Sequence, residues 1–355
     1  MTIEHMESRM DHLSRRLFLA GAAAAGAAPA LAKARRAAET VTNPLVRQRA
    51  DAQVFRHTDG WYYLTGSVPE YDRLVLRRSK TIAGLSTAPE TVLWRHQASG
   101  PLSGFIWAPE LHLIDNKWIM YFAAGPSGGG EDVFRIRTYA VQCDGPDPIR
   151  GTWSLLGQLQ TAWDSFNLDS TSFVHRGQRY LAWAQREDGF DTNSNLYLAP
   201  LATPLTFAAR PARLSVPTLP WEVQGFKVNE APALLARNGR LFMTYSASAT
   251  DARYCMGMLT ARDDADIMDP AAWAKSPQPV FKTSVENKVF GPGHNSFTVD
   301  ANGRDLLVYH GRDYEKITGD PLFDPNRHTR VQPFAYRADG APDFGVPLAN
   351  GRLRV

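Results

Sequence analysis

Residues 229–245, NEAPALLARNGRLFMTY, carry the pattern that decides the fold: a polar residue, a short apolar run, a polar turn and an aromatic-rich strand. The turn Arg237-Asn238-Gly239 is a hairpin signal between two strands. The same plan begins again near residues 50, 109, 168 and 293. Each of the five segments therefore predicts a β-hairpin that opens a repeated unit.

The leading polar residues of these units are Asp51, Glu110, Asp169, Glu230 and His294, at intervals of 59, 59, 61 and 64 residues. Such an interval is long enough for a four-stranded propeller blade. Helix signals are nearly absent, and 24 prolines and 27 glycines punctuate the chain. A β-sandwich would not require five units of near-constant length, so the sequence predicts an all-β fold, a five-bladed β-propeller.

The first strand of each blade lines the central channel of a propeller, so we expect the five leading residues to converge at one mouth. Four acids and an imidazole in one cleft are costly to the folded state unless they have a chemical role or mutual partners. Two carboxyl groups facing a glycosidic bond can hydrolyse it, one as proton donor and one as the base that activates water. A third carboxylate nearby raises the pKa of the donor.

Composition excludes several other classes of protein. The 355 residues carry 39 basic and 36 acidic side chains, a net charge of +3, without a basic stripe for nucleic acid. Cys143 and Cys255 lie 112 residues apart on units that are not neighbours, so we expect both to be free and buried. No spacing typical of a zinc site is present.

The N-terminus has the features of a twin-arginine export signal. Arg15-Arg16 precede an apolar Ala/Gly run at residues 20–28, and an A-x-A cleavage site ends at Ala32. A transmembrane anchor is the alternative, but the apolar run is short for a bilayer of ~30 Å. We expect a periplasmic or secreted protein with no membrane attachment after cleavage. The predicted division of the chain is a signal peptide at 1–32, a linker at 33–42 and a catalytic propeller at 43–355.

A set of short motifs extends across almost all of the expected mature chain. Its members are Arg49-Ala50-Asp51, Ser67–Arg73, Trp107–Glu110, Leu168–Thr171, Asn229–Pro232, Gly291–Ser296 and Arg330–Pro333. By their order and spacing the chain resembles glycoside hydrolase family 43, in particular its exo-acting α-L-arabinofuranosidases.

The resemblance implies that Asp51 is the general base, Glu230 the general acid and Asp169 the residue that modulates the pKa and orientation of the acid. It also implies inversion of the anomeric centre, for which base and acid stand roughly 6.5–9.5 Å apart. One departure is Ala52, where the family usually has a proline after the base. Loss of that proline relaxes the backbone but leaves the carboxylate in place.

Five residues are expected to bind substrate. Trp107 is a sugar-stacking platform or a core residue, and Glu110 contacts substrate or holds the loop that presents Trp107. Tyr71 lies in one of the matching motifs. Arg330 hydrogen-bonds substrate hydroxyls or neutralises the acids. The resemblance places His294 near the channel centre, where it holds water, a calcium or a sodium ion, or is a hydrogen-bonded histidine without metal.

The expected activity is release of terminal L-arabinofuranose from α-1,5-arabinan or arabino-oligosaccharides, and it requires no cofactor. Alternatives are a β-xylosidase or an endo-arabinanase with the same carboxyl groups, a retaining sucrose-cleaving propeller, and a non-catalytic carbohydrate-binding propeller. The loops Gly125–Glu131 and Asp313–Arg327 are expected to decide between exo and endo action. The predicted partner is an arabinose-containing oligo- or polysaccharide, not nucleic acid.

Overall fold

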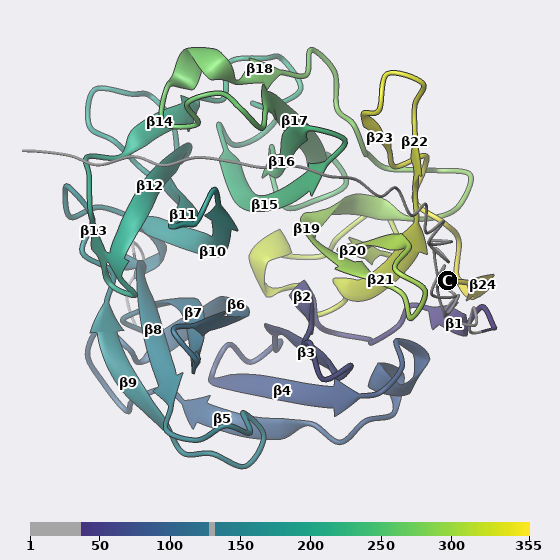
Figure 1. The fold of residues 1–355 in the computed structure, drawn as a ribbon, viewed down its shortest axis with the longest axis horizontal. Helices are drawn as coiled ribbons and strands as arrows, with labels where there is room; N and C mark the ends of the chain where they lie inside the picture. The colour runs from purple at the N-terminus through teal and green to yellow at the C-terminus, as the bar shows by residue number, and fades with distance from the viewer. Residues whose placement is uncertain (1–36, 128–131) are drawn as a thin grey trace, which may run out of the picture. The chain divides into compact units, whose positions relative to one another are not determined.

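Five antiparallel β-sheets form a ring in the computed structural model, which describes residues 37–127 and 132–355 (Figure 1). The predicted five-bladed propeller is therefore confirmed. The predicted signal peptide and the first residues of the linker lie outside the described residues.

The first three blades follow one another along the chain. Blade I contains β2 (Ala50–Arg56), β3 (Tyr62–Ser67), β4 (Arg73–Ser79) and β5 (Thr91–Arg95). Blade II contains β6 (Gly104–Ile114), β7 (Lys117–Gly125), β8 (Arg137–Cys143) and β9 (Trp153–Gln158). Blade III contains β10 (Asn167–His175), β11 (Gln178–Gln185) and β12 (Asn195–Thr203), with β13 (Thr206–Phe207) and β14 (Ala212–Ser215) both paired to β12.

The last two blades complete the ring. Blade IV contains β15 (Asn229–Arg237), β16 (Arg240–Ala247), β17 (Cys255–Arg262) and β18 (Ala274–Lys275). Blade V contains β19 (Phe290–Val299), β20 (Asp305–Arg312) and β21 (His328–Pro333), followed by the small hairpin of β22 (Ala335–Tyr336) and β23 (Pro342–Asp343). In each blade the first strand lies nearest the centre of the ring (Figure 1).

The N-terminal segment closes the ring by pairing with blade V. Val46 forms an antiparallel bridge with Thr329 of β21, and the Leu45 N–H donates to the Thr329 carbonyl at 2.8 Å. Further out, β1 (Thr40–Asn43) pairs with β24 (Gly351–Arg354). The first strand thus begins at Thr40, inside the segment expected to be a linker, because the C-terminal strand supplies its hydrogen-bonding partner.

Apolar side chains fill the spaces between blades. One cluster joins blades I and II through Leu74, Leu76, Ile106, Met120 and Phe122, each at most 1% exposed. Burial of one such side chain stabilises the fold by ~1.5–3 kcal/mol, so the inner strands that carry the site are rigidly held.

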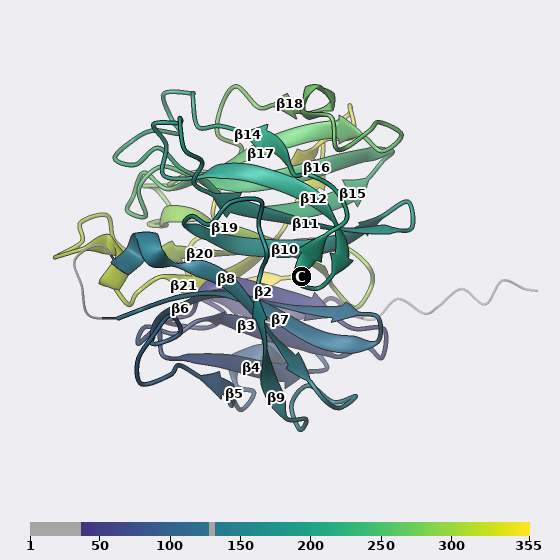
Figure 2. The ribbon, with the colours of Figure 1, turned by 90° about the vertical axis from the view of Figure 1, so that its left-hand side faces the viewer.

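Helical structure is minor in the part of the chain that the structure describes. It is limited to four 3-10 turns: η1 (Ala83–Ser86), η2 (Asp132–Arg135), η3 (Pro270–Ala272) and η4 (Pro321–Phe323). Seen from the side, η2 and η4 lie on the same face of the propeller (Figure 2). Within the described ranges no helix is long and apolar enough to cross a membrane. Cys143 and Cys255 are both free and buried, as the sequence predicts.

Candidate active site

A β-bulge recurs in the innermost strand of every blade. At each bulge one residue has a left-handed backbone conformation, with φ of 54° at Asp51, 46° at Ala108, 56° at Asp169, 52° at Ala231 and 43° at His294. Bulges of this kind turn a side chain away from the regular strand direction and are frequent next to active sites. Non-glycine residues in this conformation are uncommon, and five at equivalent positions mark a functional region.

The bulge positions correct the register expected from the sequence. The residue of blade II that is equivalent to Asp51 is Ala108, two residues before Glu110. In blade IV the equivalent residue is Ala231, one after Glu230. Four of the five expected residues still line one pocket, and Glu110 does not.

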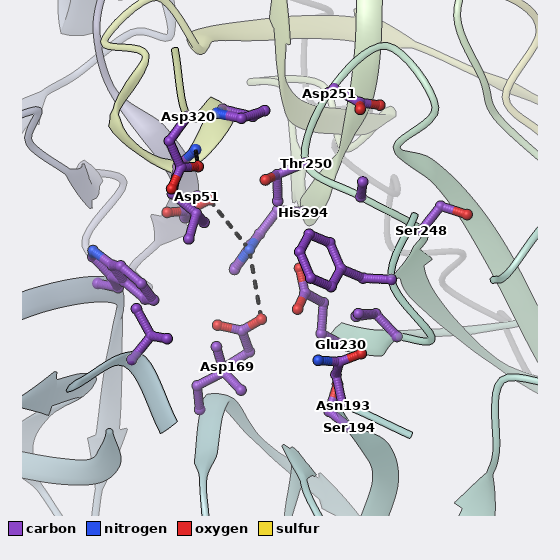
Figure 3. A pocket seen from close by; sticks show the side chains of 18 of the residues that line it. Asp51, Asp169, Asn193, Ser194, Glu230, Ser248, Thr250, Asp251, His294 and Asp320 are labelled. Atoms are coloured by element: carbon purple, nitrogen blue, oxygen red, sulfur yellow. Dashed lines mark hydrogen bonds and ion pairs between the residues drawn. The ribbon is translucent and has the colours of Figure 1, made fainter. Parts of the chain in front are cut away.

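The pocket has a volume of about 580 Å³, and residues of η2 and η4 are part of its lining. Every blade contributes to its lining. The carboxyl groups of Asp51, Asp169 and Glu230 are turned toward a shared space beside His294 (Figure 3). Most of the remaining wall is apolar, with side chains Phe105, Trp107, Val133, Phe134, Phe166, Leu168, Phe226, Val228, Leu322 and Phe323.

Asp51 is held as a carboxylate by three basic side chains. Its Oδ1 lies 3.2 Å from His310 Nδ1 and 3.3 Å from both His294 Nδ1 and Arg327 Nη1. Its Oδ2 accepts a hydrogen bond of 2.6 Å from the Ser67 hydroxyl. Burial raises the pKa of Asp51, but the attraction of Arg327, His294 and His310 together outweighs it and holds the pKa well below its usual range.

Glu230 has the opposite electrostatic character. Burial, followed by repulsion from Asp51, raises the pKa of Glu230 to about 7, although the hydroxyl of Tyr254 and the charge of Arg327 act in the other direction. The Tyr254 hydroxyl donates to Glu230 Oε1 at 2.7 Å. Glu230 can therefore carry a proton near neutral pH while Asp51 is ionised.

Asp169 interacts electrostatically with both Glu230 and Asp51. Burial and repulsion from Glu230 and Asp51 raise its pKa well above the usual range of an aspartate, although its Oδ2 accepts a 3.1 Å hydrogen bond from the Ala231 N–H. Three carboxyl groups this close cannot all ionise near neutrality. Asp169 and Glu230 therefore compete for a proton, and Asp51 does not.

The two histidines beside Asp51 have lowered pKa values. Burial lowers the pKa of His310 to about 3 and also lowers the pKa of His294 below its ordinary value. His310 accepts a 3.1 Å hydrogen bond from the Asp51 N–H, which fixes the backbone at the bulge. His294 lies 3.8 Å from the Asp169 carboxylate as well as beside Asp51, so it bridges the two acids (Figure 3).

Trp107 and His294 line the pocket, and Tyr71 lies directly behind its wall. The Tyr71 hydroxyl donates to the Leu322 carbonyl and accepts a 2.9 Å hydrogen bond from Arg327. Its ring meets Trp107 edge-on, with ring centroids 5.4 Å apart. Tyr71 thus orders the wall and the arginine, and it does not itself line the pocket.

Glu110 is not a pocket residue, which corrects the expectation that it binds substrate. It lies 3.0 Å from His112 and 3.5 Å from Gln53, deeper in the channel. These residues line a second cavity of about 310 Å³. Trp107 of the same strand lines the pocket, whereas Glu110 faces Gln53 and His112 in the second cavity.

Arg330 is also misplaced by the sequence prediction. It is fully buried in blade V, forms an ion pair with Asp313 and donates to the Asn350 side chain at 2.7 Å. The arginine that reaches the pocket is Arg327. Positions three apart in extended chain face opposite ways, so only one of the two could reach the site.

Three residues beside the acids were missed by the sequence prediction: His310, Tyr254 and Arg327. The second strand of blade V carries His310, and Tyr254 immediately precedes the third strand of blade IV. The repeat singled out only the leading polar residue of each hairpin, and neither His310 nor Tyr254 is at such a position. Arg327 lies in the loop Asp313–Arg327, which was expected to shape the cleft.

A metal site at His294 receives no support from the arrangement of ligands. In the described ranges, no group of three or more His, Cys, Asp or Glu side chains is placed to hold an ion. The calcium or sodium ion considered from the sequence stays a prediction.

One ionised and one protonated carboxyl group, at one mouth of a five-bladed propeller, define a glycoside hydrolase site. Residues 41–342 match the family model of Glycosyl hydrolases family 43, and the chain belongs to that family. The resemblance seen in the sequence is thereby confirmed.

Relatives of the chain carry consistent names. It is 54% identical over 313 residues to a Streptomyces avermitilis protein named extracellular exo-α-(1→5)-L-arabinofuranosidase, covering 88% of this chain but 64% of the relative. A Streptomyces chartreusis protein of the same name is 55% identical, and the match covers 87% of this chain and 94% of that protein. The crystal structure of an α-L-arabinofuranosidase from Lactobacillus brevis superposes with a TM-score of 0.85 at 50% identity, covering 87% and 98% of the two chains.

Proposed function

We propose that this protein is an inverting exo-α-(1→5)-L-arabinofuranosidase with Asp51 as general base and Glu230 as general acid. The observation that carries the proposal is the divergence of their pKa values, since Arg327 and two imidazoles hold Asp51 ionised while burial and repulsion keep Glu230 protonated up to about pH 7. Two carboxyl groups with different protonation states are what acid–base hydrolysis requires.

In the proposed reaction Glu230 gives its proton to the glycosidic oxygen as the bond from that oxygen to the anomeric carbon breaks. Asp51 accepts a proton from a water molecule whose oxygen bonds to the anomeric carbon from the opposite face. The products are the free sugar with inverted configuration and the shortened alcohol. We assign Asp169 the role of modulating the pKa and orientation of Glu230, because charge repulsion couples the protonation of the two carboxyl groups, and the proton transfers need no cofactor.

Exo action is supported by the enclosure of the site. All five blades contribute to the pocket wall, and η4 together with Arg327 brings the loop Asp313–Arg327 over the side of Asp51. A pocket of about 580 Å³ lies in the range of small-molecule sites and has room for a terminal pentose. The names of the relatives from two Streptomyces species support arabinofuranose as the sugar and α-1,5 as the linkage.

Export is part of the proposal. The relatives are named extracellular, and Arg15-Arg16 with the A-x-A site at Ala32 supply a twin-arginine signal in the sequence. The natural partner is then an arabinose-containing oligo- or polysaccharide outside the cytoplasm.

The test compares hydrolysis of 4-nitrophenyl α-L-arabinofuranoside, α-1,5-arabino-oligosaccharides, linear arabinan and 4-nitrophenyl β-xyloside. We expect activity on the first two, with arabinose as the sole early product from the oligosaccharides. Proton NMR during the reaction should show the β-anomer of arabinofuranose first. Early release of the α-anomer would contradict Asp51 as a base, and preference for the β-xyloside would establish the xylosidase alternative.

A further inference from the structure

Tyr254 is a buried phenol that hydrogen-bonds the proposed acid and whose ring packs against His310 and β19. It is 1% exposed, and its hydroxyl donates to Glu230 Oε1 at 2.7 Å. Its ring stacks on the imidazole of His310, with centroids 5.6 Å apart and planes at 10°. His310 in turn contacts Asp51, so the stacked rings of Tyr254 and His310 connect the proposed acid Glu230 to the proposed base Asp51.

The Tyr254 ring also packs closely against the backbone of β19. A Cβ atom at Gly293 would stand 2.5 Å from the Tyr254 ring, which is shorter than any tolerable contact. Glycine therefore lets the strand approach the ring closely. The tyrosine cannot move toward β19 or toward His310, so its hydroxyl has a defined position relative to Glu230.

The direction of the Tyr254 hydrogen bond is also fixed. The N–H of His294 donates to Ser246 Oγ at 2.8 Å, and Ser246 also hydrogen-bonds the Tyr254 hydroxyl. Because the backbone N–H occupies an acceptor site on Ser246, the serine can direct its own hydrogen to the phenol oxygen. The hydrogen of Tyr254 is then directed at Glu230.

We propose that Tyr254 is a positioning residue for proton donation: by donating to Oε1 of Glu230, it leaves the transferable proton on Oε2 and stabilises the carboxylate formed when that proton leaves. This inference rests on the proposed role of Glu230 as the acid. Hydrogen bonds to charged groups are stronger than those to neutral ones, so the Tyr254 bond strengthens as Glu230 ionises during the reaction.

The charges around this pair are consistent with a phenol that stays protonated. Burial and the carboxylates of Glu230 and Asp169 raise the pKa of Tyr254 well above its ordinary value. Glu230 faces Asp51 and Arg327 as well, which act on its pKa in opposite directions. Tyr254 therefore donates throughout the working pH range, and its hydrogen bond to Glu230 stays the same until the Glu230 carboxyl ionises.

The test is Tyr254→Phe, which keeps the ring stack and removes only the hydroxyl. For α-1,5-arabino-oligosaccharides we expect kcat to fall on the order of tenfold to a hundredfold, as the loss of one hydrogen bond to a charged group predicts. The basic limb of the kcat/KM profile should move to higher pH, because the bond lowers the pKa of Glu230. The loss should be smaller for 4-nitrophenyl arabinofuranoside, whose leaving group departs without a proton.

Tyr309→Phe is the matched control. Tyr309 is also fully buried, and its hydroxyl bonds Gln332 at 2.9 Å, away from the pocket. The Tyr309→Phe protein should be less stable but keep the wild-type pH profile and the wild-type ratio of activities on the two substrates. Ser246→Ala is a second variant that leaves Tyr254 intact but frees its hydroxyl to rotate, and it should change the profile in the same direction to a smaller extent.

Outcomes for the inference and for the proposed function can be told apart. A folded Tyr254→Phe protein with an unmoved basic limb, or with equal losses on both substrates, overturns the positioning role even if Glu230→Gln is inactive. Inactivity of the wild-type protein on all arabinofuranosides would instead refute the proposed function. A Tyr309→Phe protein with the same altered profile would also overturn the inference.

Discussion

The substitution Glu230→Gln separates two consequences of one carboxyl group: its effect on the stability of the fold and its role in catalysis. The pKa of Glu230 rises from the ordinary value of 4.5 to about 7 in the folded protein. Between these values the folded state holds a proton that the unfolded state has lost, so the stability falls as pH rises through this window. At 1.36 kcal/mol for each pKa unit, the ionised group costs the fold about 3 kcal/mol above pH 7.

Glutamine cannot ionise, so the variant should escape this cost. We expect equal free energies of unfolding near pH 4.5 and a variant that is more stable by up to ~3 kcal/mol at pH 8, measured by urea unfolding. Activity should move the other way: kcat/KM on oligosaccharides should fall by about 10²- to 10⁴-fold, the usual contribution of a general acid. The wild-type profile should show its basic limb near pH 7.

Glu90→Gln is a control for which the expected change in stability has the opposite sign. Arg49 and Arg77 together outweigh the burial of Glu90 and lower its pKa, so its stabilisation is present above the unfolded pKa and lost as pH falls. This variant should be less stable at pH 8 and keep full activity. If Glu230→Gln shows no stability gain that grows from pH 5 to pH 8, the raised pKa is wrong. If it keeps oligosaccharide activity within tenfold of wild type, Glu230 is not the acid.

Three further perturbations address other parts of the molecule. Arg327→Met should move both limbs of the kcat/KM profile to higher pH, because Arg327 lowers the pKa of both carboxyl groups that define them; an unmoved acid limb would refute its pairing with the base. Arg330→Met should lower stability by about 2 kcal/mol in urea unfolding and leave the pH profile unchanged, since it pairs with a carboxylate away from the pocket; a shifted profile would return it to the site. Replacement of Arg15 and Arg16 by lysine should leave uncleaved protein in the cytoplasm on immunoblots of cell fractions, and normal secretion would contradict the twin-arginine assignment.

The fold was predictable because the inner hairpin of each blade has a recognisable local sequence pattern. An apolar run, a turn with glycine or asparagine and an aromatic strand recur five times, and each can be recognised without knowledge of the others. The outer strands differ from blade to blade, since β13 and β14 share one partner and the fourth place of blade V belongs to Val46. No sequence repeat marks these strands, because they bury different surfaces.

The convergence of Asp51, Asp169, Glu230 and His294 on one pocket followed from the repeat, but their environment did not. The strand order within blade IV brings Tyr254 to Glu230, and the packing of blade V beside blade I brings His310 to Asp51. Such contacts join residues far apart in the chain that share no local pattern. A single sequence shows the acids of the site but not the groups that set their pKa values.

The bulge register gives the acid and the base different hydrogen-bonding partners. Asp51 and Asp169 both occupy the left-handed position of their strands, whereas in blade IV that position is Ala231, whose N–H donates to Asp169. Glu230 stands one residue earlier and meets the Tyr254 hydroxyl instead of a guanidinium 3.3 Å away, as Asp51 does. Five equivalent acids in a symmetric ring would share one environment and one pKa. Displacement of the glutamate by one residue therefore gives it a phenol as partner instead of a guanidinium, whereas Asp169, which shares the bulge position of Asp51, has its pKa raised by burial and by the charges of Glu230 and Asp51.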